Sequence, residues 1–429
     1  MQFLFQPIGT LEDNVVFPNQ PTCCLTDRWP TPVRDSHVFV ENAASLEGWL
    51  VRRIPMGFLY RWFGRPLLRF QDSERAHHRS LALLRLTASN PLGRLALRTM
   101  YKPRRRLPVT VFGHTYDHPF GLAAGMDKNA TALSGWESVG LAFIEIGGVT
   151  MLQQDGNPKP RMFRADASKA LVNRMGFNNA GSESIAAKLD HLKRRGVKHG
   201  VPLWANLGKS KLTPLDDAHI DYATSLTCLW NHVDVFVINV SSPNTPQLRT
   251  LQNDDHLVRI LMACHEANAA CAEQNGRDVK PILVKIAPDL DDHQLQTVVH
   301  MAKGNGAAGI VVSNTTVSRP ETAHPKEKRV FAEQGGLSGQ PVKDRSTELI
   351  RQVRQLAGPE WPIVGVGGVA SADDAWEKIV AGATLVQAYS GFVFEGPALT
   401  KAVVHGLHRR ILDLNFPSIQ DAVGRGHDP

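Results

Sequence analysis

The sequence predicts an α/β fold, a (β/α)8 TIM barrel that carries a two-helix N-terminal appendage. From residue 107 onward, eight short apolar runs alternate with helical patterns, which is typical of parallel strands joined by covering helices. Polar or glycine-rich sets follow nearly every run, and positive charge is concentrated ahead of the first run. A doubly wound sheet is the alternative, but its usual GxGxxG fingerprint is absent after the first run.

Composition sets the broad class. The chain has 429 residues, of which 42% are hydrophobic and 21% charged, enough for one large α/β domain with an appendage or for two domains. Five cysteines without a CxxC pair indicate a reducing compartment. No run of 18 apolar residues predicts a membrane span.

The charge is unevenly distributed along the chain. Residues 51–106 hold fourteen Arg or Lys against two acidic residues, a net charge of +12 within a total of +7, so the remainder carries −5. One basic surface on a mildly acidic body argues against a nucleic-acid partner and for a single docking face.

The first hundred residues divide into two parts. We expect residues 1–50 to be a poorly ordered extension, and Met56, where a helical pattern begins, is a candidate natural start. Helices are predicted over residues 56–70, kinked at Pro66, and over residues 73–86, capped by Ser73. Basic amphipathic helices of this kind suit contact with a membrane surface. The alternative is a helical hairpin packed on the body, with a solvated basic face.

The barrel is predicted over residues 107–415, with a tail over 416–429. Its expected strands are residues 120–124, 142–146, 203–207, 235–240, 282–286, 309–312, 363–366 and 385–388. Helices are expected between most of them, for example over residues 257–274 and 292–303. In such a barrel the functional side chains follow the strands, on the C-terminal face.

The residues after these strands indicate the chemistry. Gly367 and Gly368 follow strand seven, and Ser390 follows strand eight, where barrels commonly bind phosphate through backbone N–H groups. Lys128 and Lys285 stand where a flat, electron-accepting ring would lie, and one of them could neutralise the charge that the ring gains on reduction. Each lysine could equally be half of a buried ion pair.

Amide and hydroxyl groups dominate the rest of this face. The heptapeptide NVSSPNT, residues 239–245, leaves strand four with two serines and two asparagines, either as an active-site floor or as a polar loop of Asx and Ser turns. Further asparagines suit a heterocycle with alternating N–H and C=O groups, because each amide can donate or accept. A Schiff-base aldolase using Lys285 is a rival enzyme, and a flavin-binding or membrane scaffold is the non-catalytic rival. Paired carboxylates and metal motifs are missing from these strand ends, so we expect no metal.

Six motifs in order resemble the quinone-linked, class 2 dihydroorotate dehydrogenases. They are GLAAGMDK (121–128), NRMGFNN (173–179), NVSSPNTP (239–246), LVKIAPD (283–289), GGLSG (335–339) and GVGG (365–368), within a match over about residues 63–412. The resemblance implies an FMN-containing enzyme of pyrimidine (UMP) biosynthesis that oxidises (S)-dihydroorotate to orotate and passes the electrons to a membrane quinone.

The resemblance also implies roles for individual residues. Ser242 would be the general base, at a position where the soluble branch of the family uses cysteine. Substrate would be bound by Lys128, Asn173, Phe177, Asn239, Asn244, Asn314 and Thr315. FMN would be bound by Ala124, Lys128, Gly148, Asn206, Asn239, Lys285, Ser313, Gly339, Gly368, Tyr389 and Ser390. The quinone would contact His77, Arg164 and Tyr389, although His77 could equally be a structural histidine.

The family pattern implies a location and has three departures in this chain. We expect a monomer bound peripherally to the cytoplasmic face of the cell inner membrane, with the basic helices as its quinone domain over residues 51–100. Gly148 replaces a Thr or Ser that usually touches the flavin, and Ser313 replaces a Thr. Gln247 replaces a Gly and could change how its loop closes over substrate.

Overall fold

The computed structural model describes residue 57 and residues 60–197, 199–245, 248–252, 254–321 and 324–427. The predicted N-terminal extension, Met56 and Gln247 lie outside the described residues.

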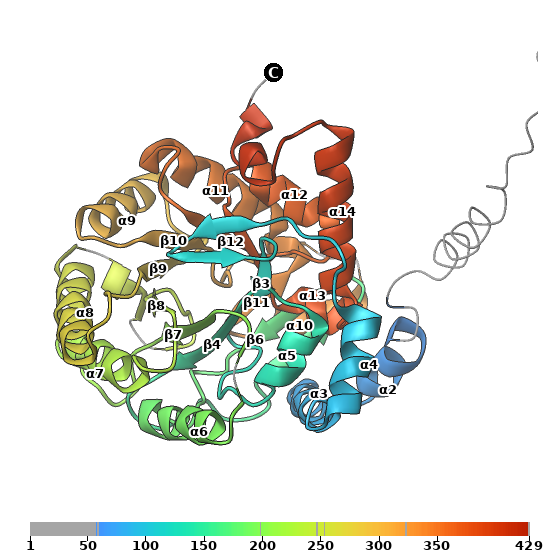
Figure 1. Ribbon diagram of the computed structural model, residues 1–429, viewed down its shortest axis with the longest axis horizontal. Helices are drawn as coiled ribbons and strands as arrows, with labels where there is room; N and C mark the ends of the chain where they lie inside the picture. Colours follow the sequence, from blue (N-terminus) through green and yellow to red (C-terminus); the bar gives the residue numbers. More distant parts are fainter. Residues whose placement is uncertain are drawn as a thin grey trace, which may run out of the picture. The chain divides into compact units, whose positions relative to one another are not determined.

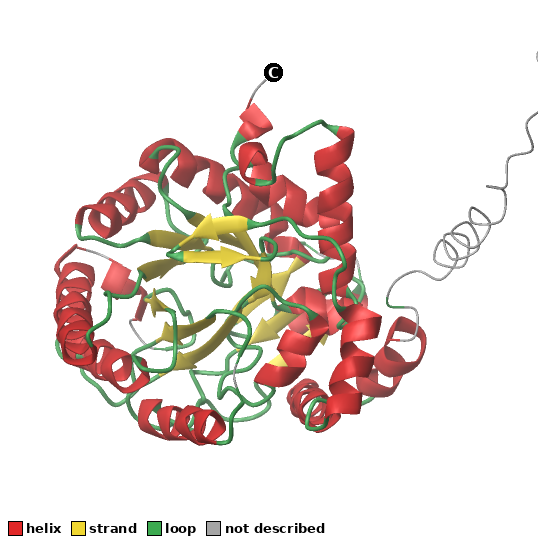
Figure 2. Cartoon of the chain, viewed as in Figure 1, coloured by secondary structure: helices red, strands yellow, loops and turns green. Residues whose placement is uncertain are grey.

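The described chain folds around a closed barrel of eight parallel strands, which confirms the predicted fold class (Figures 1 and 2). The strands close in the order β10-β12-β13-β3-β4-β7-β8-β9. Their bounds are β3 (Phe120–Leu122), β4 (Ile144–Val149), β7 (Leu203–Leu207), β8 (Val235–Asn239), β9 (Ile282–Ile286), β10 (Gly309–Val312), β12 (Ile363–Val366) and β13 (Leu385–Ala388). The covering helices are α5 (Leu133–Val139), α6 (Ser182–Arg194), α7 (Ala218–Leu229), α8 (Asp254–Asn275), α9 (Asp292–Gly304), α11 (Lys343–Ala357), α12 (Ala372–Val380) and α14 (Leu399–Asp413).

The barrel strands are buried along their whole length, as strands covered by helices must be, and this is why their sequences read as continuous apolar runs. The second strand differs most from its predicted bounds. It was expected over residues 142–146 but extends to Val149, because Gly147 pairs with Asn206 and Val149 with Leu207. Both glycines lie beyond the predicted end of the strand, but Gly147 keeps a ladder partner, and Gly148 is the unpaired residue at the irregularity between Gly147 and Val149.

An aromatic cluster closes the N-terminal end of the barrel. The hairpin of β1 (Val109–Val111) and β2 (His114–Tyr116) brings the Tyr116 ring 5.4 Å from Phe143 and 6.2 Å from Trp204, which stack on each other at 4.5 Å. The side chain of Gln420 accepts a hydrogen bond from the Thr110 N–H, so part of the C-terminal tail is anchored at the same end. Side chains thus fill the N-terminal end of the barrel, whereas ligands of such barrels bind at the C-terminal end.

A small antiparallel sheet, which the sequence did not predict, stands beside the C-terminal end. It consists of β5 (Met162–Ala165), β6 (Ala170–Asn173) and β11 (Gly336–Gly339), with α10 (Pro325–Phe331) next to it. Gly336 pairs with Asn173 and Gly339 with Ala170. The sheet therefore joins two insertions that are far apart in the chain and places Asn173 and Gly339 near the barrel opening.

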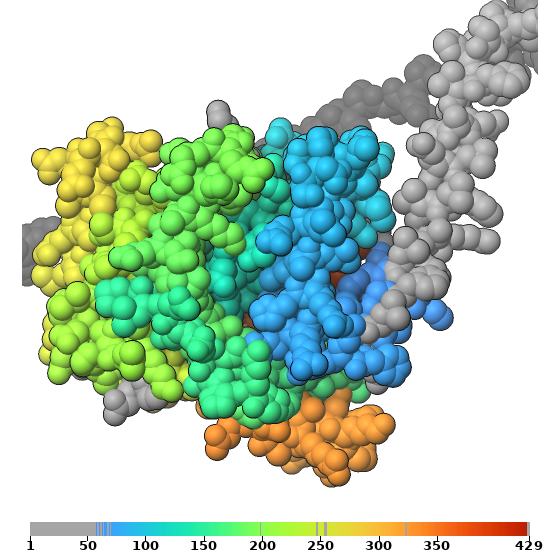
Figure 3. All heavy atoms as spheres, turned by 90° about the horizontal axis from the view of Figure 1, so that it is seen from below, coloured from blue at the N-terminus to red at the C-terminus, as the bar shows by residue number. Residues whose placement is uncertain are grey.

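The N-terminal helices pack against the barrel on one side (Figure 3). The helix predicted over residues 56–70 is a π-helical turn (Tyr60–Gly64) that runs into α2 (Arg65–Arg69), and the change of helix type occurs next to Pro66. The second helix is α3 (Ser73–Thr87), but its N-cap is Asp72 instead of Ser73, because the Asp72 carboxylate accepts the N–H groups of Glu74 and Arg75.

A third helix, α4 (Pro91–Tyr101), was missed, so the prediction of two helices was too few. Its start carries the usual signals, since Asn90 accepts the Gly93 N–H as N-cap and Pro91 follows directly. Only Leu97 of α4 is buried, and this weak apolar stripe hid the helix in the sequence. The barrel touches α3 so closely that a Cβ on Gly135 would lie 2.5 Å from Leu84 Cγ.

Candidate active site

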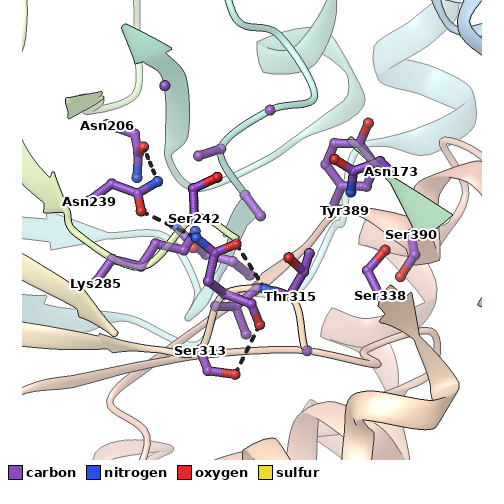
Figure 4. A pocket seen from close by; sticks show the side chains of 18 of the residues that line it. Asn173, Asn206, Asn239, Ser242, Lys285, Ser313, Thr315, Ser338, Tyr389 and Ser390 are labelled. Carbon is purple, nitrogen blue, oxygen red and sulfur yellow. Dashed lines mark hydrogen bonds between the residues drawn. The ribbon is translucent and has the colours of Figure 1, made fainter. Parts of the chain in front are cut away.

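One pocket at the C-terminal end of the barrel gathers the predicted substrate and flavin residues (Figure 4). It is lined by all of the following predicted residues: Ala124, Lys128, Gly148, Asn173, Phe177, Asn206, Asn239, Ser242, Asn244, Lys285, Ser313, Asn314, Thr315, Gly339, Gly368, Tyr389 and Ser390. They come from the ends of the barrel strands and from the small sheet. The tertiary fold therefore brings together residues spread over most of the barrel sequence.

A relay of side-chain hydrogen bonds crosses the pocket floor, starting from a carboxylate that the sequence analysis missed. Glu145 on β4 is fully buried and accepts from Asn206 Nδ2 at 2.7 Å. Asn206 Oδ1 accepts from Asn239 Nδ2 at 2.8 Å, and Asn239 Oδ1 accepts from Asn314 Nδ2 at 3.2 Å. Because the Glu145 oxygen accepts from the Asn206 amide N–H, the direction of every following amide along the relay is fixed. Gln387 on β13 donates to the other Glu145 oxygen.

Glu145 and Gln387 each left a trace in the sequence. They are polar residues inside otherwise apolar strands, at positions where burial demands a partner. Their mutual contact joins β4 to β13, whose residues are 242 positions apart, and no local pattern reveals such a pairing.

The loop of residues 239–245 separates its two serines by role. Ser241 is fully buried, and its Oγ donates to Asn239 Oδ1 at 3.0 Å and accepts from Asn314 Nδ2 at 3.0 Å. Ser242 faces the pocket, and its Oγ accepts only the long bond from the Asn244 N–H at 3.3 Å. The Ser242 hydroxyl proton has no acceptor among the described residues, whereas Ser241 is committed to the relay. The loop is thus neither a simple turn nor a uniform floor.

Arg249, also missed from the sequence, holds this loop from behind. Its guanidinium donates to the Ser241 carbonyl at 3.2 Å, to the Thr315 carbonyl at 3.0 Å and to Asp289 Oδ2 at 2.8 Å. The five donors of a guanidinium make such a three-way clamp possible. The clamp fixes the loops after β8 and β10 relative to each other.

Two lysines bring positive charge into the pocket. Lys128 donates to Asn178 Oδ1, and burial lowers the pKa of its ammonium to about 7, with the charge of Arg161 acting in the same direction. Lys285 is 5% exposed and lines the pocket, and its ammonium has no carboxylate within 4.0 Å among the residues described. The sequence analysis left open whether each lysine forms a buried ion pair. Among the described residues, neither lysine does.

Glycine backbone forms the opposite wall of the pocket. Gly367 and Gly368 after β12 have φ values of +130° and +73°, and a Cβ on Gly368 would lie 2.5 Å from Lys343 Cβ. Only glycine fits this approach to α11 without strain. Ser390 at the start of α13 (Ser390–Glu395) and Gly339 line the same end, so backbone and hydroxyl donors converge there.

The Gly148 departure has a packing reason. A Cβ on Gly148 would lie 2.5 Å from the ring of Phe177, whose own φ is +49°. The Phe177 ring therefore occupies the space that a Ser or Thr side chain would take. Ser313, the second departure, keeps a hydroxyl in the pocket, which donates to the Asn314 carbonyl at 3.1 Å.

A second, mainly apolar cavity of about 640 Å³ lies between the N-terminal helices and the barrel. The three predicted quinone residues, His77, Arg164 and Tyr389, all line it. Tyr389 lines both cavities, so the polar pocket and the apolar cavity meet at this residue.

The ionisable groups of this cavity are held in defined states. Burial lowers the pKa of His77 to about 3, assisted by the charge of Lys128, so the imidazole is neutral at physiological pH. Burial raises the pKa of the Tyr389 phenol well above its usual value, so this hydroxyl keeps its proton. Arg164 donates to the Leu68 carbonyl and lies 3.6 Å from Asp166.

These features define a class of protein: a parallel (β/α)8 barrel with a polar pocket at the C-terminal ends of its strands and a mainly apolar cavity beside it. Residues 106–411 match the family described as Dihydroorotate dehydrogenase. The chain belongs to this family, in its quinone-linked class 2.

Individual relatives agree over most of the chain. A Dihydroorotate dehydrogenase (quinone) from Gloeobacter violaceus is 43% identical over 366 residues, covering 85% of this chain and 98% of the relative. One from Chromobacterium violaceum is 47% identical over 336 residues, covering 78% of this chain and 94% of that protein. The crystal structure of DHODH in complex with ferulenol from Eimeria tenella aligns with a TM-score of 0.75 at 33% identity, covering 84% of this chain and 97% of that one.

Proposed function

We propose that the chain oxidises (S)-dihydroorotate to orotate in de novo pyrimidine (UMP) biosynthesis, with FMN as hydride acceptor and a membrane quinone as final electron acceptor. The observation that carries the proposal is the shared wall at Tyr389 between a polar pocket and an apolar cavity. An enzyme that couples a water-soluble substrate to a lipid-soluble acceptor needs two such sites beside one cofactor.

The pocket fits FMN. The glycine wall at Gly367 and Gly368 suits the phosphate, because backbone without side chains can approach an anion closely. Lys285 supplies a cation without a nearby carboxylate, and the buried Gln387 Oε1 has no hydrogen-bond partner among the described residues. When bound, FMN accepts a hydride from the substrate and passes two electrons on. Asn206, Asn239 and Lys128 would hold its ring system.

The pocket also fits a dihydropyrimidine. Asn244 Oδ1 is buried without a partner among the described residues, so it can accept a ring N–H, while Asn244 Nδ2 donates to Asn173 Oδ1 at 3.2 Å. Each amide hydrogen left free by the relay can meet a substrate carbonyl. The ammonium of Lys128 suits the substrate carboxylate.

Ser242 is the proton acceptor in this proposal. It takes the proton from C5 of dihydroorotate while the hydride leaves from C6. A serine hydroxyl is a weak base, so the step depends on a pocket shielded from water and on passing the proton onward. Ser242 is 7% exposed and its hydroxyl is uncommitted, which supports the assignment over Ser241.

The apolar cavity would take the quinone. Its walls include apolar side chains of α3 together with Met126 and Phe392, and most of its lining surface is apolar. Neutral His77, Arg164 and protonated Tyr389 are the lining groups that the family resemblance assigns to the quinone, and each can donate a hydrogen bond to a quinone oxygen.

The outer face of the N-terminal helices would rest on the membrane, on the cytoplasmic side of the inner membrane, with the enzyme as a monomer. Phe70, Leu83, Leu86, Leu92 and Leu95 are 61–90% exposed there, among arginines. Such a surface suits acyl chains below and anionic headgroups above. Among the described helices, none is long and apolar enough to cross a bilayer.

The test is to mix the purified protein with dihydroorotate without oxygen and follow its visible absorbance. We expect a bound flavin spectrum that dihydroorotate bleaches and that added quinone restores. A protein without flavin, or a flavin that dihydroorotate leaves oxidised, would refute the proposed activity. Bleaching without recovery on adding quinone would refute the acceptor alone.

A further inference from the structure

Lys378 on α12 is a fully buried lysine that neither proposed site uses. Its ammonium donates to Ser346 Oγ at 2.6 Å, to Thr347 Oγ1 at 3.1 Å and to the Lys343 carbonyl at 3.4 Å. No carboxylate of the described residues lies within 4.0 Å of it, because the neighbouring acids Asp374 and Glu377 pair with Lys343 instead. A buried charge without a counter-charge is costly, so an anion close by is expected to balance it.

The hydrogen bonds of Lys378 lead to the glycine wall. Ser346 Oγ, which accepts from Lys378, lies 3.2 Å from the Gly367 carbonyl and 2.9 Å from the Lys343 carbonyl, and can donate to either. Gln340 Nε2 donates to the Gly368 carbonyl at 2.7 Å. Gln340 thus holds the Gly368 carbonyl, and the Ser346 hydroxyl on α11 is placed to hold the Gly367 carbonyl.

This arrangement determines where the opposite N–H groups point. In a trans peptide the N–H lies opposite the C=O of the preceding residue. Holding the carbonyls of Gly367 and Gly368 from behind therefore turns the N–H groups of Gly368 and Val369 away from Ser346 and Gln340. Gly368 and Val369 both line the pocket.

We propose that Lys378 is a positioning residue for the flavin phosphate: acting through Ser346, its buried ammonium fixes the Gly367–Gly368 peptide and places positive charge behind it. The inference rests on the proposed function, which assigns the phosphate of FMN to these glycines. Lys378 does not touch the pocket itself. It acts on the anion through the loop and through its field, which low-dielectric surroundings screen weakly.

The decisive comparison is between FMN and riboflavin, which differ only in the phosphate. Flavin-free full-length protein is titrated with each by quenching of flavin fluorescence. We expect Lys378→Met to raise the Kd for FMN by on the order of tenfold to a hundredfold, the size for one screened unit charge. The Kd for riboflavin should stay within about threefold.

Two further variants distinguish the proposed role of Lys378 from a general loss of stability. Ser346→Ala keeps the charge but removes the link to Gly367, so it should weaken FMN binding in the same selective way but less. Lys280→Met is the matched control, because Lys280 is another lysine with a lowered pKa, and it bonds the Trp230 and Val233 carbonyls at the opposite end of the barrel. We expect it to change neither Kd.

The pH dependence gives an independent readout. Burial lowers the pKa of Lys378 to about 7 against the opposing charges of Asp374 and Glu377 on α12 and of Asp344 on α11, with Lys343 acting in the same direction as burial. The ammonium therefore loses its proton in the flavin-free protein above that pH. The wild-type Kd for FMN should rise between about pH 7 and about pH 9, and that for riboflavin should not.

The outcomes are distinct. If wild type binds riboflavin as tightly as FMN, the phosphate assignment of the proposed function fails. If wild type prefers FMN but Lys378→Met weakens both flavins equally, or neither, the inference about Lys378 is wrong. Should Lys378→Met not fold, a Ser346→Ala variant with unchanged FMN binding and a flat wild-type pH profile would overturn it.

Discussion

Replacing Ser242 by alanine isolates the proton-transfer step. The Ser242 hydroxyl makes one long hydrogen bond, at 3.3 Å to the Asn244 N–H, so its removal should cost less than about 1 kcal/mol of folding free energy. A positioned general base contributes about 10²–10⁴ in rate. Since each tenfold change corresponds to about 1.4 kcal/mol, the barrier should rise by about 3–5 kcal/mol. The loss of rate is therefore far larger than any loss of folded protein could explain.

The assay is anaerobic stopped-flow reduction of the bound flavin by dihydroorotate, with thermal unfolding measured on the same sample. Reduction should slow by the stated factor, while the melting temperature and the concentration of dihydroorotate at half-maximal rate stay close to wild type. Ser242→Cys should recover part of the rate, with a rise toward alkaline pH as the thiol ionises. Flavin reduction within about threefold of wild type in Ser242→Ala would refute the assignment of the base.

The neighbouring serine provides the comparison. Ser241 is fully buried and bonded to both Asn239 and Asn314, so Ser241→Ala should destabilise the protein by about 1–2 kcal/mol. It should weaken substrate binding more than it slows the chemical step. If the two alanine variants showed the same loss of rate at saturating substrate, the division of roles between the serines would be wrong.

Three further predictions concern the relay, the apolar cavity and the N-terminal helices. In the Glu145→Gln variant, the new amide can donate as well as accept, which allows the Asn206 amide to reverse. The KM for dihydroorotate should then rise by on the order of tenfold. An unchanged KM would contradict the directional relay. Ala76→Phe adds a ring to the apolar cavity, so it should slow reoxidation of the flavin by quinone but leave anaerobic reduction of the flavin by dihydroorotate unaffected. Equal slowing of both steps would contradict two separate sites. Burial alone raises the pKa of Glu74, but the hydrogen bonds and charge of Arg161 outweigh it and hold the pKa below its usual 4.5. The Glu74–Arg161 pair therefore stabilises the fold above about pH 4.5, and this stabilisation is lost as the pH falls through the lowered pKa of Glu74. Glu74→Gln should cost about 3–5 kcal/mol in urea unfolding near neutral pH and remove this acid-dependent part, and a wild-type acid profile in the variant would contradict it.

The barrel was predictable because its signal is local. Each strand is a buried apolar run, and each run is followed by residues that a barrel needs at its C-terminal end. The missed elements lack that signal. The strands β5, β6 and β11 have only four residues each, and α4 buries only Leu97.

Both interpretations of the N-terminal helices apply to part of their surface. The sequence left open a membrane contact or a hairpin packed on the body. One side of α3 packs on α5 at Leu84 and Gly135, while Leu83 and Leu86 are exposed on α3. The helix pattern alone could not decide, because the same leucine stripe serves packing, the apolar cavity and the exposed face.

The sequence by itself determined the barrel, the family and the residue types that line the pocket, since these depend on short-range hydropathy and on motifs. Only the tertiary structure decided how those residues are connected. The direction of the amide relay depends on the contacts of Glu145 with Asn206 and Gln387. Tyr389 lines the apolar cavity because α3 packs beside the barrel and supplies other walls of that cavity. Hydrogen-bond direction and cavity walls are set by groups far apart in the chain, which no local pattern contains.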